Sequence, residues 1–599
     1  TAGFALQDPR RWQWLPPVGT KQYYMLLAVV GMFILGPMGA VTAAFMNFSI
    51  GFFVGGQVLA GILGSVITYG YGAEGKHGAN YMQTTAASVA ALGGMGVLIQ
   101  AMTWMGMPPV PAWQMMVYML CIGMLGAGVG MLYTPILVDR LRLTFPSGLA
   151  VANILRALTD PVLLKQSVSR LFGGMGVGVV GGVIAEKIAF FGTIGFSPST
   201  LGTGLVVGAR VGIPALMGGL TGLALTPFFV SIGWLHEGEQ FRKVTFLIAL
   251  GMILGAAIVD LSLIFWRTFH HARNLGQQEA APDEQRNGPK SSIKRLALWI
   301  ALWSAATVVA GMQFFNEPLG YMLLSVGLVF IFAMVNGISL GVSDSNPISS
   351  AFVVTVVVLA AFGLNDPMLG LMAAAVLLVG TTVACDMQQD RSTGWRLGSN
   401  RTLQFRFQVG GLVVGAALSV AMAALFMKAY PVLNIDQTLP GAAEKVGHWT
   451  SAMTFKFVGI LRSLTDPKPF QLQAIFIGVG IGFAIEAARK IIKSRADYKR
   501  YVASGQAGFN VDFVLDAVVL PSPYAFTFGW FVPLATSVYM GVGGVLSSAY
   551  NALTAKKSKA STDELPSDMS TTSLLGGGLI AGEALAALTL GLIGLAAVM

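Results

Sequence analysis

Glu583 is a carboxylate inside an apolar segment, where charged residues are rare. It lies in Gly582-Glu583-Ala584, and its nearest charged neighbour in the sequence is Asp568, outside that segment. A charged group at the centre of a membrane helix costs about 2.5–3.5 kcal/mol, so such a group is usually kept for a reason. A carboxylate there can exchange a proton or bind a polar ligand, and we expect proton coupling. A structural hydrogen bond to a neighbouring helix is the alternative.

Two further glutamates follow a shared glycine pattern, in Gly178-xxx-Gly182-xxx-Glu186 and Gly478-xxx-Gly482-xxx-Glu486. Residues at this spacing share one face of a helix, and glycines let helices approach closely. That face is therefore expected to pack against another helix or to line a path, and both glutamates are candidates for proton coupling. Basic residues follow each of them closely, so partial charge pairing near a membrane interface is the alternative.

An eight-residue sequence occurs twice. Ile154-Leu155-Arg156-Ala157-Leu158-Thr159-Asp160-Pro161 returns as Ile460-Leu461-Arg462-Ser463-Leu464-Thr465-Asp466-Pro467, with a single substitution. Threonine and aspartate hydrogen-bond to nearby backbone, and the residue before proline avoids the helical conformation, so each copy predicts a turn. Arg156 and Asp160, like Arg462 and Asp466, have the spacing of an ion pair on a helical turn, just before Pro161 or Pro467. Direct contact with a substrate is the alternative.

The composition places most of the chain in a membrane. Of its 599 residues, 54% are hydrophobic and only 11% are charged. Soluble domains average about 25% charged residues, so lipid must cover much of this surface. The formal net charge is +10, and the positive residues cluster in short loops. This distribution indicates a topology signal and contact with membrane lipid, and no nucleic acid partner.

Short motifs that could indicate an enzyme or a cofactor lack the context they need. Gly337-Ile338-Ser339-Leu340-Gly341 resembles the turn around a hydrolase nucleophile, which requires a strand, a helix and a histidine partner. Gly176-x-Gly178-x-x-Gly181 has the spacing of a dinucleotide-binding loop, without a strand pattern before it. His236-Glu237-Gly238-Glu239 fits a polar turn better than a metal site. We therefore expect no cofactor, no metal site and no enzymatic activity.

Apolar runs of about 18 residues or more predict the membrane spans. We expect an all-α integral membrane protein with about 14–16 transmembrane helices in two homologous halves. Breaks such as Ser343-Asp344-Ser345-Asn346-Pro347 predict some broken or re-entrant helices. The expected parts are a cytoplasmic N-terminal segment (1–21), a first transmembrane repeat (22–265), a polar cytoplasmic linker (266–295) and a second transmembrane repeat (296–599).

Basic residues predict the orientation. The N-terminal segment and the linker both carry Lys and Arg, so both are expected on the cytoplasmic side. An even number of crossings must then separate them, which makes the halves parallel repeats. Duplicated halves with charges in apolar helices are typical of secondary transporters, whose substrate path lies between the repeats.

Five short segments resemble motifs of the oligopeptide transporter family, in the family's order and over nearly the whole chain. They are Asn80-Tyr81-Met82-Gln83-Thr84, Phe145-Pro146-Ser147-Gly148-Leu149-Ala150, Ser345-Asn346-Pro347-Ile348-Ser349, Asp390-Arg391-Ser392-Thr393-Gly394 with Gly398 and Gln404, and Ala581-Gly582-Glu583. Phe145 departs from the family's aromatic hydroxyl, and Arg391 stands near its lysine position. The resemblance implies proton-coupled import of small peptides or metal–chelator complexes.

Within that resemblance, amide and hydroxyl side chains beside irregular backbone are the candidates for substrate contacts: Asn80, Gln83, Thr84, Asn346 and Ser349. We expect a proton-driven symporter of small oligopeptides or peptide-like solutes. It would work by alternating access in a bacterial-type inner membrane, and a homodimer is one assembly to test. A metal-chelate transporter is the alternative. An intramembrane hydrolase using Ser339 and a passive channel are alternatives of other kinds.

Overall fold

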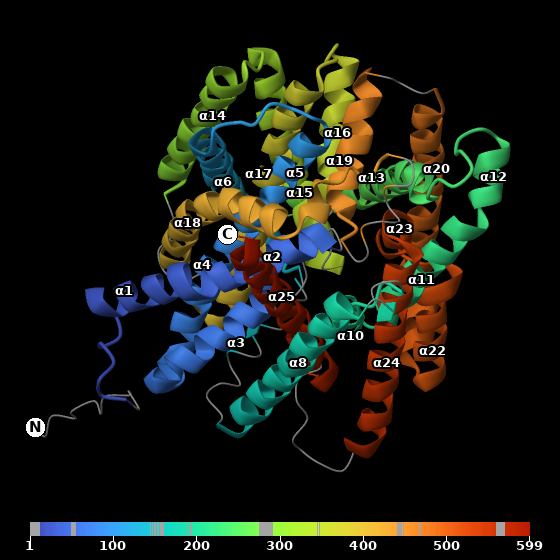
Figure 1. The fold of residues 1–599 in the computed structure, drawn as a ribbon. Helices are drawn as coiled ribbons and strands as arrows, with labels where there is room; N and C mark the ends of the chain where they lie inside the picture. The colour runs from blue at the N-terminus through green and yellow to red at the C-terminus, as the bar shows by residue number, and fades with distance from the viewer. Residues whose placement is uncertain are drawn as a thin grey trace, which may run out of the picture.

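The computed structural model describes residues 12–49, 56–143, 145, 148, 151–152, 155, 161–188, 190–191, 194–274, 292–343, 346, 348–439, 442, 446, 449–465, 469–558 and 570–598. Regular structure in these residues is helical, and no strand occurs among them (Figure 1). The predicted all-α class is therefore confirmed.

The helices form two bundles, and each bundle takes helices from both halves of the chain (Figure 1). The first bundle comprises α1 (Lys21–Val30), α2 (Gly36–Ser49), α3 (Gly56–Thr68), α4 (Gly75–Gly93), α5 (Val97–Trp104), α6 (Ala112–Thr134), α14 (Ile293–Phe315), α15 (Leu319–Ser343), α16 (Ile348–Ala361), α17 (Pro367–Leu397) and α18 (Arg401–Ala429). Its centre is formed by α4, α6, α17 and α18, which pack against one another.

The second bundle runs down the right side of Figure 1 to its lower centre and holds the remaining long helices. It comprises α8 (Pro161–Lys187), α10 (Pro198–Val207), α11 (Ala209–Ala224), α12 (Thr226–Ser231), α13 (Arg242–Asn274), α20 (Pro469–Ser494), α21 (Ala496–Ala503), α22 (Gln506–Val514), α23 (Pro523–Phe531), α24 (Leu534–Ser558) and α25 (Thr571–Val598). Helix α19 (Ala452–Thr465) packs on α2, α5, α16 and α17 of the first bundle.

Ten helical segments among the described residues are long and apolar enough to cross a membrane. Four further helices, α8, α20, α24 and α25, have 27, 26, 25 and 28 residues. Large apolar side chains such as Phe33, Phe172 and Phe476 are exposed on the outside of the bundles. Because water would not favour such a surface, lipid must cover it, and the chain is an integral membrane protein.

Two short helices begin at a Ser-Pro pair where the chain is interrupted. Helix α10 starts after Ser197, and α23 starts after Ser522, each with proline in its first turn. Proline suits this position because its missing N–H has no partner at a helix start. Interrupted helices at membrane depth are tolerated where protein surrounds the irregular backbone.

Glycines allow the closest helix contacts of the second bundle. Helix α8 packs against α25, and α20 packs against α13. A Cβ atom at Gly178 would lie 2.5 Å from the carbonyl oxygen of Leu579, and one at Gly482 would lie 2.0 Å from that of Met252. The glycine-rich face of each helix thus packs against another helix, as its spacing predicts. Each helix takes that partner from the other end of the chain.

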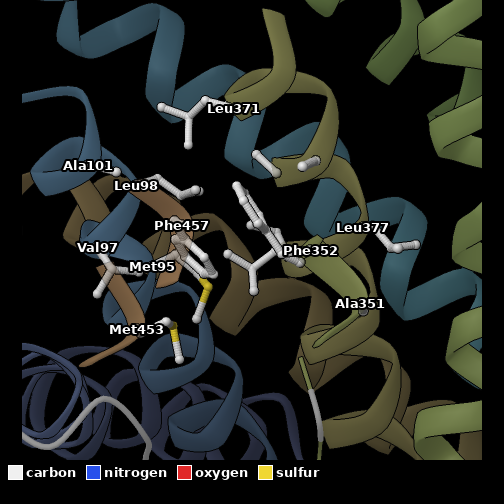
Figure 2. Packing of buried hydrophobic residues seen from close by; sticks show 14 of the residues in the cluster. Met95, Val97, Leu98, Ala101, Ala351, Phe352, Leu371, Leu377, Met453 and Phe457 are labelled. Atoms are coloured by element: carbon white, nitrogen blue, oxygen red, sulfur yellow. The ribbon is translucent and has the colours of Figure 1, made fainter. Parts of the chain in front are cut away.

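A buried apolar core fixes α19 to the first bundle (Figure 2). The rings of Phe352 on α16 and Phe457 on α19 stack with centroids 4.0 Å apart and an interplanar angle of 24°. Side chains of α5 and α17, among them Leu98 and Leu371, complete the core around the two rings. This packing determines where the neighbouring side chains of α16 and α19 point.

Candidate functional site

Six polar side chains meet at the centre of the first bundle, where α4, α17 and α18 pack together. We call them the polar cluster: Asn80, Gln83, Thr84, Asp390, Arg391 and Gln404. Every one has 0% relative exposure. Three of them, Asn80, Gln83 and Thr84, were predicted from the sequence as substrate contacts. The structure links Gln83 to Asp390 and Thr84 to Gln404, and Asn80 lies one turn before Gln83 and Thr84 on α4.

Hydrogen bonds link the cluster across the three helices. The Gln83 amide nitrogen donates to the Asp390 carboxylate at 2.5 Å. The Gln404 amide nitrogen donates to the Thr84 hydroxyl at 3.1 Å and to the Asp390 carbonyl at 2.6 Å. Arg391 donates to the Gln404 side-chain oxygen at 3.4 Å. These bonds order the cluster but leave part of its capacity unused.

Several buried atoms of the cluster find no hydrogen-bond partner among the residues that the structure describes. They are both amide atoms of Asn80, Oε1 of Gln83, Oδ2 of Asp390, and Nε and Nη2 of Arg391. A buried polar atom without a partner costs about 1–3 kcal/mol, so such atoms usually meet water or a ligand. The cluster therefore presents both donors and acceptors at one place inside the protein.

Local sequence explains why these side chains converge. Gln83 and Thr84 follow Asn80 on α4 by three and four positions, so both lie on the same side of the helix as Asn80. Helix α17 ends at Gly398 in the left-handed conformation, with φ of 74°. Asn400 then caps α18, and its side chain accepts hydrogen bonds from the backbone N–H groups of Thr402 and Leu403 at 3.0 Å. This tight turn returns Gln404 to Asp390.

Two described residues before α8, Phe145 and Gly148, contact α15 and α17. The Thr393 hydroxyl donates to the carbonyl of Gly148 at 2.9 Å. A Cβ atom at Gly148 would lie 2.9 Å from the carbonyl oxygen of Gln389, so glycine permits this approach. Phe145 is fully buried with φ of 44°, and its N–H donates to the carbonyl of Gly341 at 2.8 Å.

Glu583, the main candidate for proton coupling, lies in the second bundle where α8, α10 and α25 meet. It is 2% exposed and faces protein. Its Oε2 accepts a hydrogen bond from the Ser197 hydroxyl at 3.0 Å and another from the backbone N–H of Ser199. Both donors belong to the N-terminal end of α10, whose dipole favours a negative charge. Gly182 of α8 makes room, since a Cβ there would lie 3.2 Å from the Glu583 Cα.

Glu486 is 5% exposed and lies among charges of both signs. It pairs with Arg489 and with Lys490, each at 3.2 Å. Lys490 also pairs with Asp260 at 2.6 Å, and the Tyr524 hydroxyl donates to Asp260 at 3.1 Å. The charge pairing expected for Glu486 is therefore present. The side chain of Glu186 lies outside the described part of the chain.

The other two predicted substrate contacts, Asn346 and Ser349, form no hydrogen bond with the polar cluster among the described residues. Asn346 is half-buried, and its Oδ1 has no partner among the described residues. Ser349 in the first turn of α16 accepts a hydrogen bond from Lys456 of α19 at 3.4 Å. The sequence analysis missed Lys456, although a lysine in the apolar stretch around Phe455 and Phe457 was a visible signal.

Of the predicted turn residues, Arg156, Asp160, Asp466 and Pro467 lie outside the described residues. Pro161 is the first residue of α8. Arg462 lies in the last turn of α19 and donates hydrogen bonds to the side chains of Asp436 and Thr438. These contacts tie the helix end to the loop that follows α18.

The motifs that resemble enzyme or cofactor sites in the sequence lie within long helices. Residues 337–341, with Ser339, lie within α15, so no strand-turn-helix elbow is present there. Residues 176–181 lie within α8. In the part of the chain that the structure describes, no three His, Cys, Asp or Glu side chains gather as a metal site would require.

A helical membrane protein with polar side chains enclosed between helices from both ends of its chain has the architecture of a membrane transporter. The chain belongs to the oligopeptide transporter family, because the family model described as "OPT oligopeptide transporter protein" matches residues 23–593. It is a transporter and not an enzyme.

Two relatives of this chain carry the names of transporters. The "Putative oligopeptide transporter" of Haemophilus influenzae is 26% identical over 496 residues, which cover 67% of this chain and 77% of the relative. The "Probable metal-nicotianamine transporter YSL5" of Arabidopsis thaliana is 22% identical over 373 residues, which cover 51% of each chain. The names of the two relatives thus point to two kinds of substrate.

Proposed function

We propose that this transporter is a proton-coupled symporter of small peptides or peptide-like solutes, working by alternating access. The observation that carries the proposal is the set of unpaired donors and acceptors in the polar cluster. A peptide offers alternating N–H and C=O groups. Oε1 of Gln83 and Oδ2 of Asp390 can accept from its N–H groups, and the free nitrogens of Arg391 can donate to its carbonyl oxygens.

Asn80 is suited to a direct role because its amide has one donor group and one acceptor, both free. One peptide unit can satisfy both at once. Thr84 and Gln404 bond to each other and hold the wall of the site. We assign Asn80, Gln83, Asp390 and Arg391 to substrate binding, and Thr84 and Gln404 to positioning these groups.

The two bundles supply the moving parts in this proposal. The helices of each bundle pack tightly against one another. Few helices contact the other bundle, and the main contacts are those of α25 with α2 and α18. One bundle can then rock against the other while the packing inside each is kept. Glu583 lies on α25, one of the helices at this boundary.

Glu583 is placed to make that motion depend on a proton. When ionised, it accepts hydrogen bonds from Ser197 and from the backbone of Ser199. When protonated, one of its oxygens becomes a donor, so this pair of bonds weakens. Protonation would thereby loosen α25 from the N-terminal end of α10. Glu486, paired with two basic residues, and Glu186 remain further candidates for coupling.

Reconstituted protein in vesicles with an imposed pH gradient tests the proposal. We expect uptake of labelled tripeptides to follow the gradient, and Glu583→Gln to retain binding but lose the response to the gradient. Glu74→Gln is the matched control, because Glu74 is exposed. Uptake that ignores the gradient in the parent protein would favour a passive channel and contradict the symporter.

Metal–chelate complexes are the second candidate substrate, favoured by the name of the Arabidopsis relative. A chelator carries carboxylates and amines, which the polar cluster can also bind. Competition of iron- or nickel-loaded chelators against a labelled tripeptide distinguishes the two classes. Displacement of the peptide by chelates alone, at concentrations where peptides fail, would reassign the substrate.

We also propose that the N-terminus faces the cytoplasm of a bacterial-type inner membrane, with lipid around both bundles. Labelling of single introduced cysteines from either side tests the orientation. A homodimer is proposed as the assembly, and the mass of the detergent-solubilised protein by light scattering tests it.

A further inference from the structure

Lys456 of α19 is a buried cation without a carboxylate partner. Its residue exposure is 6%. The ammonium lies 3.4 Å from the hydroxyl of Ser349 and 3.5 Å from the centroid of the Phe531 ring. Among the residues that the structure describes, it forms no ion pair with an Asp or Glu. A lysine has three N–H donors, and one hydroxyl with one ring face leaves that capacity partly unused.

The ammonium lies where the two bundles meet. The stack of Phe457 on Phe352 holds α19 against α16 of the first bundle (Figure 2). Phe531 is the last residue of α23, which belongs to the second bundle. A ligand bound to Lys456 would therefore contact both parts that the proposed transport cycle moves.

The N-terminal end of α16 favours an anion beside Lys456. Ser349 is the second residue of α16, and the N-terminal end of a helix carries a partial positive charge. A lysine ammonium next to that end is repelled unless a negative group lies between them or close by. The ring face of Phe531, 3.5 Å from the ammonium, stabilises the cation but supplies no anion.

We propose that Lys456 binds a carboxylate of the transported solute, with Ser349 donating a second hydrogen bond from its hydroxyl. This inference rests on the proposed function, and it implies that the transported solute carries a carboxylate. Carboxylates are present at the C-terminus of a peptide and on metal chelators, so the site serves either substrate class. Charge-assisted hydrogen bonds of this kind are roughly twice as strong as neutral ones.

Binding measurements on the full-length protein in detergent test the inference with a matched ligand pair, trialanine and trialanine amide. We expect the parent protein to bind the free acid about tenfold or more tightly than the amide, which corresponds to about 1.4 kcal/mol. Lys456→Met keeps a similar shape without the charge, and should bring that ratio close to one. Lys456→Arg should retain most of the preference.

Lys428→Met is the control for the loss of a positive charge, because Lys428 is exposed near the end of α18. It should leave the ratio unchanged. Acetate and acetamide provide a second readout that needs no peptide: acetate should raise the melting temperature of the parent protein more than that of Lys456→Met, and acetamide should not.

The outcomes separate the inference from the proposed function. If acetate stabilises the protein through Lys456 but no peptide is taken up, the carboxylate site stands and the peptide substrate is wrong. If the parent protein prefers neither trialanine over its amide nor acetate over acetamide, the carboxylate site is overturned. The same holds if Lys456→Met keeps both preferences.

Discussion

The amide of Gln83 on α4 and the carboxylate of Asp390 on α17 are joined by a hydrogen bond of 2.5 Å, although 307 positions separate them in the chain. Both side chains are completely buried. The bond connects α4, from the N-terminal part of the chain, with α17, from its second half, at the centre of the first bundle, so the polar cluster forms only when these two parts have folded together.

Replacing Gln83 with leucine tests how much this bond stabilises the fold. The Asp390 oxygen that accepts from Gln83 would lose its donor, and leaving a buried acceptor unpaired costs about 1–3 kcal/mol. We expect the melting temperature in detergent to fall. The double variant Gln83→Leu/Asp390→Leu should recover part of the loss, since both polar partners are gone. Strict additivity of the two single changes would show that the residues do not interact.

The turn between α17 and α18 gives a second prediction about the same cluster. Asn400→Ala removes the side-chain cap of α18, which costs about 0.5–2 kcal/mol. Because this turn returns Gln404 to Asp390, we also expect weaker substrate binding. Ser292→Ala is the matched control, since Ser292 precedes α14 without a side-chain cap bond. Melting temperature and ligand affinity measured on both variants check the prediction. Equal effects of the two changes would contradict it.

Closely spaced glycines in α8 and α20 allow a test with internal controls. Gly178→Ala and Gly482→Ala would push a Cβ to 2.5 Å and 2.0 Å from a carbonyl oxygen of the facing helix. Gly176 and Gly480 have nothing within 4 Å of an added Cβ. We expect Gly178→Ala and Gly482→Ala to destabilise by about 1–3 kcal/mol. Gly176→Ala and Gly480→Ala should be neutral or stabilising by up to about 1 kcal/mol.

Unfolding in detergent, followed by helix content, would measure these four variants. Similar losses for Gly178 and Gly482 would support equivalent roles in the two repeats. A loss at Gly176 as large as that at Gly178 would contradict the prediction, because helix propensity favours alanine and an added Cβ at Gly176 meets nothing within 4 Å.

The sequence predicts the helical elements well because a long apolar run has few alternatives in a membrane. It also predicts that the glycine faces of α8 and α20 pack against other helices, and it singles out Asn80, Gln83 and Thr84 as polar candidates. The sequence does not predict which helices pack against each other. Nothing in the repeat indicates that α8 packs against α25 from the other end of the chain, because helix pairing depends on tertiary contacts distant in sequence.

The same limit applies to the candidate site. Asp390 and Arg391 are visible in the sequence as charges near an apolar run, but their burial and their contact with α4 depend on the turn at Gly398 and on α18. Lys456 falls in a short apolar run that is followed by Arg462, and the sequence alone does not show whether its ammonium is exposed or enclosed. Only the packing of α19 on α16 shows that its ammonium is enclosed.

Glu317 gives a pH-dependent prediction outside the membrane-spanning segments. It lies in the short turn between α14 and α15, is 2% exposed, and its carboxylate oxygens have no hydrogen-bond partner among the described residues. Burial, with a smaller contribution from the negative charge of Asp366, raises the pKa of Glu317 from 4.5 to about 9. The folded protein therefore keeps a proton that the unfolded chain releases near pH 4.5.

The free energy of unfolding should then be highest below about pH 4.5 and fall as the pH rises toward 9, by at most about 1.4 kcal/mol per pH unit. Glu317→Gln keeps the shape and stays neutral, so it should remove this part of the fall and stabilise the protein more at pH 8 than at pH 5. Melting temperatures of the parent protein and the variant across this range measure the difference. Glu74→Gln, at an exposed position, should leave the slope unchanged, and an equal gain from Glu317→Gln at both pH values would show that Glu317 is already ionised in the folded protein.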